Sequence, residues 1–232
     1  MIIIYCNIIM IKIGTDCSGI DAPIEALKQM KSKYIHEFSC DNNKYCKQSI
    51  FANHKPKIFF DDMLNRNHKN LPDIDIYICG FPCQSFSSIG QKLGLDDKRS
   101  NVMIECLKTI KSKSPTVFIL ENVKRLKNFN NGEVMKLITK KIDTKKYKLF
   151  IDIYNTKDYG IPQNRERLYI IGIKKDNLKE DYKIPKKIKM KQLDIFLLDH
   201  SYHKNTIISP SLQINLNKID DLKEHYVVTP HT

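Results

Sequence analysis

The stretch that decides the fold begins with a short apolar run, Asp75 to Cys79, and continues as Gly80-Phe81-Pro82-Cys83-Gln84-Ser85-Phe86-Ser87-Ser88-Ile89-Gly90. The apolar run has the length and the β-branched content of a strand, and the glycine and proline that follow mark a turn. Pro82 fixes its own φ angle and biases the preceding residue toward an extended conformation, so the backbone before Cys83 is stiff. A strand that ends in a glycine-flanked loop with a thiol at its centre is a good position for a nucleophile. An isolated cysteine is nevertheless more often a small buried hydrophobe.

Apolar and amphipathic segments alternate along the rest of the chain. The predicted strands cover Ile11–Cys17, Ile35–Cys40, Ile58–Phe60, Asp75–Cys79, Pro115–Leu120, Tyr147–Tyr154 and Arg167–Ile173. The predicted helices cover Ala22–Lys31, Lys44–Ala52, Asn101–Ser112 and a segment that begins near Gly132 and continues through Lys136–Asp143. This alternation predicts an α/β fold with a mostly parallel sheet flanked by helices, in which the last two strands form a hairpin-like pair at one edge.

The composition favours a nucleic-acid partner. The formal net charge is +13 and the isoelectric point is near 9.3, values that suit association with a polyanion. The chain is also rich in Lys, Ile, Asn and Tyr, as an A+T-rich genome would make it, and this explanation of the charge carries equal weight. No apolar run is long enough to cross a membrane, so no membrane partner is expected.

The seven cysteines argue against a metal site and against a secreted protein. They include no C-x-x-C pair and no Cys/His spacing typical of zinc. Their odd number and the absence of a secretory signal favour reduced thiols. We therefore expect no metal, and a cytosolic or nuclear setting.

Polar residues follow several of the predicted strands. Gly19 lies between the first strand and the first helix, where a glycine lets the backbone pass close to a ligand, as in Rossmann-type folds. Asp41 follows the second strand, where an acidic side chain can accept hydrogen bonds from both ribose hydroxyls of a nucleoside cofactor. The alternative is that Asp41, Asn42 or Asn43 caps the next helix. Glu121 follows the fifth strand, and a carboxylate at the end of a buried strand is costly unless it is paired or functional.

Three motifs, met in this order, resemble those of the C5-cytosine DNA methyltransferases. They are the loop from Gly80 to Ser87, the triplet Glu121-Asn122-Val123 and the segment Gln163-Asn164-Arg165-Glu166-Arg167. Three motifs in one order are far more specific than any one, and the resemblance extends from Ile13 to Gly172. It implies the Rossmann-like fold of S-adenosylmethionine-dependent methyltransferases, S-adenosyl-L-methionine as cofactor and duplex DNA as substrate. A tRNA cytosine-5 methyltransferase, and a subunit that binds cofactor or nucleic acid without turnover, are the alternatives.

The resemblance also implies roles for individual residues. Cys83 would add to C6 of a flipped cytosine, and Glu121 would supply a proton at N3. Arg167 would hold the cytosine O2 and orient Glu121, while Arg165 would hold a backbone phosphate. The residues implied for substrate binding are Gln84, Ser85, Ser87, Asn122 and Gln163. Those implied for the cofactor are Cys17, Ser18, Gly19, Ile20, Asp41, Asn42, Asp62 (with Asp61 as the alternative), Met63, Gly80, Pro82 and Val102.

The chain departs from the family's pattern at two places. Asp21 stands where the family usually has a second glycine, and we expect its side chain to crowd the methionine end of the cofactor. The closing motifs of the family are not found after Gly172, where the segment from Lys174 to Lys191 is rich in lysine and shows no clear helix or strand period.

These features predict a catalytic and cofactor-binding domain over residues 10–173 and a partial or reduced target-recognition region over residues 174–232. The chain is then half of a split enzyme completed by a second polypeptide, a truncated enzyme, or a compact active form. A DNA-modifying protein of this kind, in restriction–modification or another role, is expected in the cytoplasm, at the nucleoid, or in the host cell if its source is viral.

Overall fold

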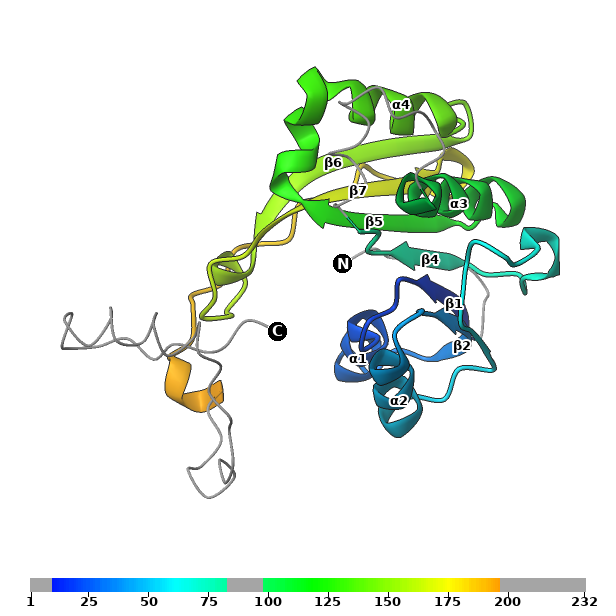
Figure 1. Ribbon diagram of the computed structural model, residues 1–232. Coiled ribbons are helices and arrows are strands. Elements are labelled where there is room, and N and C mark those ends of the chain that lie inside the picture. The colour runs from blue at the N-terminus through cyan, green and yellow to red at the C-terminus, as the bar shows by residue number, and fades with distance from the viewer. Residues whose placement is uncertain (1–9, 83–97, 197–232) are drawn as a thin grey trace, which may run out of the picture. The chain divides into compact units, whose positions relative to one another are not determined.

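The computed structural model describes residues 10–82 and 98–196 of the 232-residue chain (Figure 1). Two units can be distinguished, residues 1–190 and residues 191–232. Within its described part, the second unit contains one element, the short 3₁₀ helix η7 (Leu193–Phe196). The first unit contains the whole sheet and residues 174–190, so the predicted start of a recognition region at residue 174 stays a prediction.

Seven strands form one sheet in the order β3-β2-β1-β4-β5-β7-β6. Their bounds are β1 Ile11–Asp16, β2 Tyr34–Cys40, β3 Ile58–Phe60, β4 Ile76–Cys79, β5 Val117–Val123, β6 Tyr147–Asn155 and β7 Glu166–Lys174. The first five strands pair in parallel, whereas β7 runs antiparallel to both of its neighbours. The predicted α/β fold, mostly parallel with an antiparallel pair at one edge, is therefore confirmed.

The helices follow local sequence signals. Their bounds are α1 Ala22–Gln29, α2 Lys44–Asn53, η1 His68–Asn70, α3 Lys98–Lys113, η4 Lys124–Gly132, α4 Glu133–Lys141, η5 Thr156–Asp158 and η6 Lys175–Asn177. Pro23 occupies the first turn of α1, where its missing N–H costs nothing. Asn43 caps α2, since its side chain accepts a hydrogen bond from the Tyr45 amide. Figure 1 shows α1 and α2 next to each other near β1 and β2.

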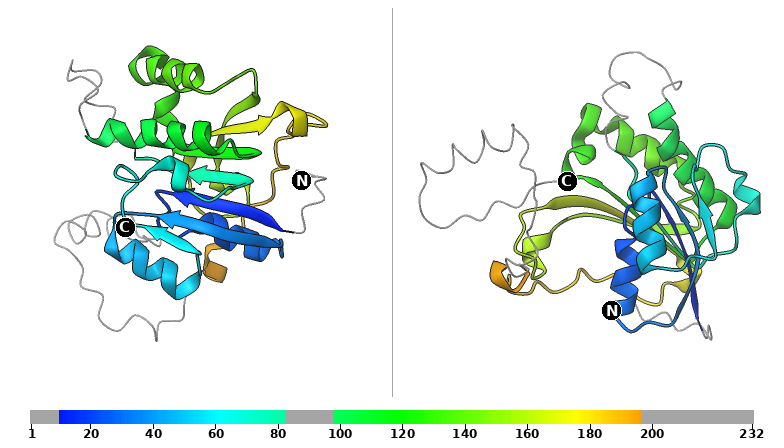
Figure 2. Two further views of the ribbon diagram at one scale, coloured as in Figure 1. Left: turned by 90° about the vertical axis from the view of Figure 1, so that its right-hand side faces the viewer. Right: turned by 60° about the horizontal axis from the view of Figure 1, so that its bottom comes forward.

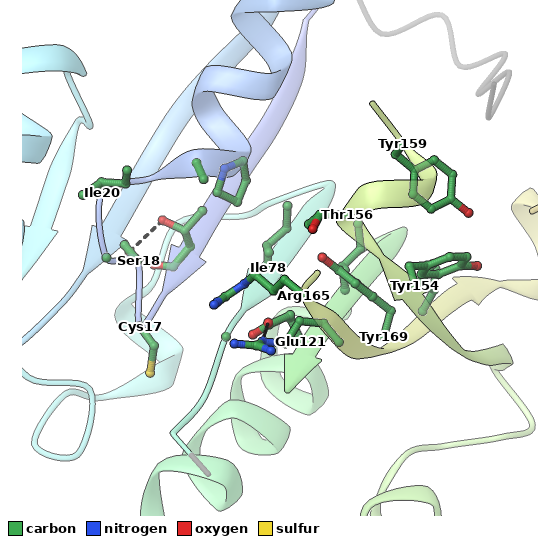
Figure 3. A pocket seen from close by; sticks show the side chains of 18 of the residues that line it. Cys17, Ser18, Ile20, Ile78, Glu121, Tyr154, Thr156, Tyr159, Arg165 and Tyr169 are labelled. Atoms are coloured by element: carbon green, nitrogen blue, oxygen red, sulfur yellow. Dashed lines mark hydrogen bonds and ion pairs between the residues drawn. The ribbon is translucent and has the colours of Figure 1, made fainter. Parts of the chain in front are cut away.

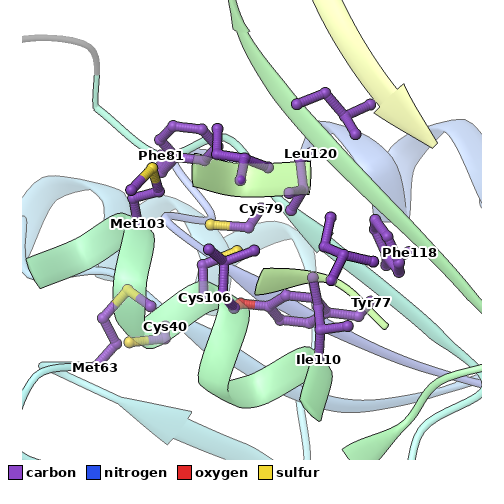
Figure 4. Close-up of a cluster of buried hydrophobic side chains, with 14 of the residues drawn as sticks. Cys40, Met63, Tyr77, Cys79, Phe81, Met103, Cys106, Ile110, Phe118 and Leu120 are labelled. Atoms are coloured by element: carbon purple, nitrogen blue, oxygen red, sulfur yellow. The ribbon is translucent and has the colours of Figure 1, made fainter. Parts of the chain in front are cut away.

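Alternating residues of the central strands face two different environments. On one face, side chains of β4 and β5 such as Tyr77, Cys79, Phe118 and Leu120 pack with residues of α3, η4 and α4 into the main core (Figure 4). The two further views in Figure 2 show the sheet from the side, with these helices along it. Gly172 of β7 pairs with Phe118, and a Cβ atom there would lie 2.1 Å from the Phe118 ring, so the ring requires glycine at this position.

The sheet changes winding direction between β1 and β4. β1 pairs with β2 on one side and with β4 on the other, and Asp16 at the end of β1 lies opposite Cys79 at the end of β4. In open α/β sheets, ligands bind outside the carboxyl ends of the strands at such a switch point. The loops that follow β1 and β4 are therefore the expected place for a site.

Most predicted element bounds agree with the observed ones to within a few residues. The largest difference that concerns the site is in β5, which was predicted to end at Leu120 and continues to Val123. Glu121 and Asn122 are part of the strand because they extend the antiparallel ladder, opposite Tyr169 and Leu168 of β7. Among the described residues, no helix is long and apolar enough to cross a membrane, and no cluster of His, Cys, Asp and Glu could hold a metal ion.

Candidate active site

A cavity of about 740 Å³ opens at the switch point (Figure 3). One part of its wall is the loop between β1 and α1, from Asp16 to Ile20, together with Ala22 and Pro23. Another part consists of Gly80 after β4 and of side chains from β5 and β7. The remaining wall comes from β6, the turn that follows it and the segment after β7. Four tyrosines line the cavity: Tyr154 of β6, Tyr159 of the turn, Tyr169 of β7 and Tyr182 of the segment after β7.

The loop after β1 is joined to the end of β2 by consecutive hydrogen bonds. Ser18 Oγ contacts both the amide and the carbonyl of Cys40, at 3.0 and 3.1 Å. The amide of Gly19 donates to Asp41 Oδ2 at 2.8 Å. Gly19 has a φ of +56° and nothing lies within 4 Å of the position of a Cβ atom, so glycine is needed for the backbone conformation while its outer side stays open. Ser18, Gly19 and Ile20 all line the cavity, as a cofactor loop should.

Asp41 is held in place by two backbone amides. Its Oδ2 accepts from Gly19, and its Oδ1 accepts from the amide of Asn43 at 2.9 Å. Because Asn43 is the cap of α2, the alternative that Asp41 caps this helix is wrong. Each carboxylate oxygen has a second lone pair, which can still accept a hydroxyl. Asn42, the other residue expected here, is exposed.

The expected crowding by Asp21 does not occur in the structure. Asp21 is fully buried and does not line the cavity. Its carboxylate accepts hydrogen bonds from Thr15 at 2.7 Å and from Ser39 at 2.6 Å, in the interior between β1 and β2. The residue has a φ of +59°, a left-handed conformation that glycine adopts readily and aspartate tolerates. Burial raises the pKa of Asp21, and the two hydroxyl donors oppose that rise.

The base of the loop is fixed by a second buried carboxylate, Asp16. The two terminal guanidinium nitrogens of Arg66, Nη1 and Nη2, donate to Asp16, and Tyr77 Oη donates to it at 2.5 Å. Arg66 also lies 5.3 Å from the ring centres of Phe38 and Phe60. Burial on its own would lower the pKa of Arg66, but the contacts with Asp16 outweigh this and raise it, so the guanidinium stays charged.

Cys17 lines the cavity, but its environment does not favour a nucleophile. Its thiol contacts Met63 Sδ at 4.0 Å, and a hydrogen bond with the Cys79 thiol together with burial raises the pKa of Cys17. A thiolate is the reactive form, so a raised pKa makes this thiol inert. Cys17 therefore serves as a wall residue, in keeping with its predicted place in the cofactor loop.

The residues predicted around Asp62 lie outside the cavity wall. Asp62 accepts from the Leu64 amide at 2.8 Å and from the Asn65 side chain at 2.6 Å. Met63 is buried in the main core, and Val102 of α3 packs against the same core. Asp61, the alternative to Asp62, pairs with Lys47 at 2.7 Å. The cofactor roles of Asp62, Met63 and Val102 stay predictions.

Glu121 and Arg167 form an ion pair inside the cavity. Arg167 Nε lies 3.0 Å from Glu121 Oε1, with 23% and 28% of the two side chains exposed. The second carboxylate oxygen, Oε2, is beside Gly80, where a Cβ atom would be 3.3 Å away. Gly80 thus leaves room for the carboxylate. Figure 3 shows Glu121 between the loop that carries Cys17 and Ser18 and the strand that carries Tyr169.

Arg165 reaches the same cavity through a turn that is clamped by Asn155. The Asn155 Oδ1 accepts from the amide of Arg165 at 3.1 Å and from that of Lys157 at 3.3 Å, while its Nδ2 donates to Asn164 at 2.7 Å. The side chain of Arg165 lines the cavity. Gln163 is exposed and is not part of the wall; its carbonyl accepts from Thr156 at 2.6 Å.

Asn122 is buried and holds the stem of the loop after β4. Its Nδ2 donates to the carbonyl of Phe81 at 2.8 Å. This contact ties β5 to the two residues, Phe81 and Pro82, that precede Cys83. The nucleophile candidate Cys83 and the substrate candidates Gln84, Ser85 and Ser87 lie outside the described residues.

Sequence reasoning missed the residues that position others. Asn155, Asp21 and the cavity tyrosines were not predicted to belong to the site, although Asp21 was recognised as a departure. Tyr159 directly precedes Gly160, next to the recognised motif, so proximity to that motif was the available signal. No local pattern marks Asn155, because its partners become neighbours only when the turn closes.

The fold and the site define a class. The strand order, the glycine loop after β1 and the acid after β2 are those of a Rossmann-like methyltransferase, and the solved structures that resemble the chain have the same fold. The S. pombe Dnmt2 methyltransferase matches with a TM-score of 0.67 and 17% identity, over 90% of this chain and 66% of that one. The Entamoeba histolytica methyltransferase EhMeth matches with a TM-score of 0.62 and 18% identity, over 85% and 61%.

The family follows from the sequence match. Residues 13–229 match the family described as C-5 cytosine-specific DNA methylase, and the chain belongs to this family. It is 37% identical over 150 residues to the type II methyltransferase M1.ScrFI of Lactococcus lactis subsp. cremoris, covering 64% of this chain and 38% of that protein. It is 35% identical over 151 residues to the type II methyltransferase M.NlaX of Neisseria lactamica, covering 65% and 48%. The chain thus matches less than half of the length of either relative.

Proposed function

We propose that the protein is a DNA (cytosine-5-)-methyltransferase that transfers a methyl group from S-adenosyl-L-methionine to C5 of a flipped cytosine. The observation that carries this proposal is the Glu121–Arg167 pair at 3.0 Å, inside a cavity bordered by the glycine loop after β1 and by Gly80. Arg167 occupies one carboxylate oxygen and leaves Oε2 available on the side of the loop that leads to Cys83.

The cavity residues fit the demands of the base. Cytosine is not nucleophilic at C5, so a thiolate must first add to C6 and place electron density on C5. Cys83 would form this C–S bond, and Glu121 would meet the charge that develops at N3 with a proton. Arg167 would donate to O2 and Arg165 to a phosphate. Once C5 has taken the methyl group, transfer of the C5 proton to a base lets the C6–S bond break and restores the ring, which regenerates Cys83.

The loop after β1 fits a nucleoside cofactor. Gly19 presents an open backbone to the cavity, and the lone pairs of Asp41 not used by Gly19 and Asn43 can accept ribose hydroxyls. Bound S-adenosylmethionine supplies the electrophilic methyl group. The residues around it orient it and, through apolar side chains such as Ile20 and Ile78, exclude water from the reacting atoms.

The test is transfer of labelled methyl groups by this chain alone to mixed-sequence duplex DNA and to bulk tRNA. We expect label at cytosine C5 in DNA, none with Cys83→Ser, and a loss of at least about 100-fold with Glu121→Gln, because a positioned proton donor contributes 10²–10⁴-fold. Glu25→Gln, which makes the same carboxylate-to-amide change at an exposed residue of α1 that does not line the cavity, is the matched control and should keep full activity.

Each other outcome would change the assignment. Label on tRNA alone would move the protein to RNA methylation. No label, with cofactor binding retained, would mean that a second polypeptide must supply further residues. A duplex that contains 5-fluorocytosine should form a covalent complex with the wild type but not with Cys83→Ser, and failure to trap would favour a binding subunit. We place the activity where the DNA is, at the bacterial nucleoid or, for a viral protein, in the host cell.

A further inference from the structure

The surface formed by η4, α4 and the turn after α4 is strongly basic. Residues 124–146 contain eight Lys and Arg residues against two carboxylates, Glu133 and Asp143. All eight cations are exposed. The chain as a whole carries +13 over 232 residues, so positive charge is several times denser in this segment than on average.

The folding of the segment explains why its cations face outward. Leu126, Val134, Ile138 and Ile142 are buried in the main core, which fixes the apolar side of η4 and α4 against the sheet. The other side is left to the polar residues, as in any amphipathic helix. Figures 1 and 2 show η4 and α4 as neighbours in the green part of the chain, directly after β5.

Among the described residues, seven of the eight cations of this segment have no acidic partner; Lys124, at its start, is the one that is paired. Nine lysines elsewhere or at its start form ion pairs with carboxylates: Lys28, Lys47, Lys57, Lys108, Lys113, Lys124, Lys148, Lys183 and Lys187. Within the described part of the chain, Arg125, Lys127, Lys136, Lys140, Lys141, Lys145 and Lys146 form none. An A+T-rich genome accounts for many lysines, but it does not account for their gathering, unpaired and exposed, in one segment of 23 residues.

This surface begins at the candidate active site. Lys124, the first residue of η4, directly follows β5 and pairs with Glu166 at 2.8 Å. Glu166 is the residue between Arg165 and Arg167 in the sequence. A hollow of about 590 Å³ lies here and is lined by Lys124, Arg125, Asn128, Phe129 and Asn130. Arg125 and Lys127 follow Lys124 in η4, and Lys136 lies in the first turn of α4.

We propose that Arg125, Lys127 and Lys136 form a contact surface for the phosphate backbone of duplex DNA that flanks the target cytosine. Unpaired, exposed cations close together in the chain match the regular negative charge of a duplex, and release of counterions from neutralised phosphates drives such binding. The contacts position the duplex and carry no sequence information. The inference rests on the proposed function for the identity of the nucleic acid.

The test compares three triple variants in the full chain by the salt dependence of binding to a labelled mixed-sequence duplex. Arg125→Gln/Lys127→Gln/Lys136→Gln removes the proposed contacts. Lys140→Gln/Lys145→Gln/Lys146→Gln removes cations at the far end of the same surface. Lys33→Gln/Lys55→Gln/Lys69→Gln removes three exposed, unpaired lysines outside this surface, which precede β2, β3 and β4.

The first variant should lose at least about tenfold in affinity near 0.1 M salt. Its slope of log K against log salt is negative, and the magnitude of that slope should decrease by about 2.7, or about 0.9 per lost phosphate contact. The second should lose less, and the third should match the wild type. Equal losses in all three would reduce the effect to net charge and overturn the proposal, as would stronger competition by tRNA than by duplex at equal phosphate concentration.

Binding and methyl transfer are measured separately, so the two proposals can fail separately. A selective loss by the first variant in a protein that transfers no methyl group would uphold the surface and refute the activity. Methyl transfer by a protein whose first and third variants bind alike would uphold the activity and refute the surface.

Discussion

Asp21 shows how a loop can accommodate a charged residue where a smaller one was expected. The side chain leaves the cavity and enters the interior, where Thr15 and Ser39 each donate a hydrogen bond to it. The sequence identified the residue but not this outcome, because the two hydroxyls belong to different strands. Partners of this kind are set by the packing of β1 against β2, and no local spacing in the sequence predicts them.

We expect Asp21→Asn to destabilise the fold more than it weakens cofactor binding. An amide can accept from only one of the two hydroxyls through its oxygen, so one buried group loses its partner, at about 1–3 kcal/mol. Urea unfolding should show this loss, while the dissociation constant for S-adenosylmethionine should change less than about threefold. A tenfold weaker dissociation constant with unchanged unfolding would place the side chain in the cavity.

For Asp41 we expect the opposite result, a loss of cofactor affinity rather than of stability. Its carboxylate lies at the mouth of the loop, beside Gly19, and is partly exposed. Asp41→Ala should weaken S-adenosylmethionine binding by about 1–3 kcal/mol, since buried hydroxyls of the cofactor would lose their acceptor. Isothermal titration with the cofactor measures this directly, and an unchanged dissociation constant would limit Asp41 to its contacts with Gly19 and Asn43.

Among the elements, the antiparallel pairing of β5 with β7 positions the charged residues of the site. It places Glu121 opposite Tyr169 and brings Arg167 into reach of the carboxylate. The sequence predicted both strands from their apolar runs, and it predicted the three motifs from their order. It did not predict that β5 continues through Glu121 and Asn122, because that extension depends on pairing with a strand more than 40 residues away.

The close approach of Gly172 to Phe118 makes this ladder sensitive to a single methyl group. Gly172→Ala should destabilise the protein by about 1–3 kcal/mol, the range for overpacking a dense core. Phe118→Leu should relieve part of this cost, so the penalty for Gly172→Ala should be smaller in that background. A double-mutant cycle by thermal or urea unfolding measures the coupling, and strict additivity would mean that the ring and the glycine do not compete for space.

For the molecule as a whole, the buried cluster around His36 links stability to pH. His36 is 7% exposed, and its Nε2 lies 2.8 Å from Ser39 and 3.5 Å from Asp21. The pKa of His36 is lowered to about 4, mainly by burial and also by the nearby His54 and Lys28, against a backbone contact that raises it. A histidine that is harder to protonate when folded makes the unfolded chain bind more protons below pH 6.5.

Stability should therefore be constant with respect to His36 above pH 6.5 and should fall as the pH drops from 6.5 toward 4, by up to about 3 kcal/mol. Asp21 acts in the other direction, because its raised pKa favours the folded state below that pKa and so offsets part of the loss. Urea unfolding across this range should show the decrease, and His36→Gln should flatten it. An equally steep decrease in His36→Gln would assign the effect to other groups.

The clamp by Asn155 has a consequence for any ligand of the cavity. One buried amide fixes the backbone of the turn that carries Arg165, and the ladder beside it together with the ion pair to Glu121 fixes Arg167. The conformational entropy of this turn is lost when the chain folds, not when a nucleotide arrives. A base would then meet a guanidinium and a carboxylate that are already ordered, and a phosphate would meet an arginine whose backbone is already in place. More of the interaction energy would then be available for extracting the base from the stack.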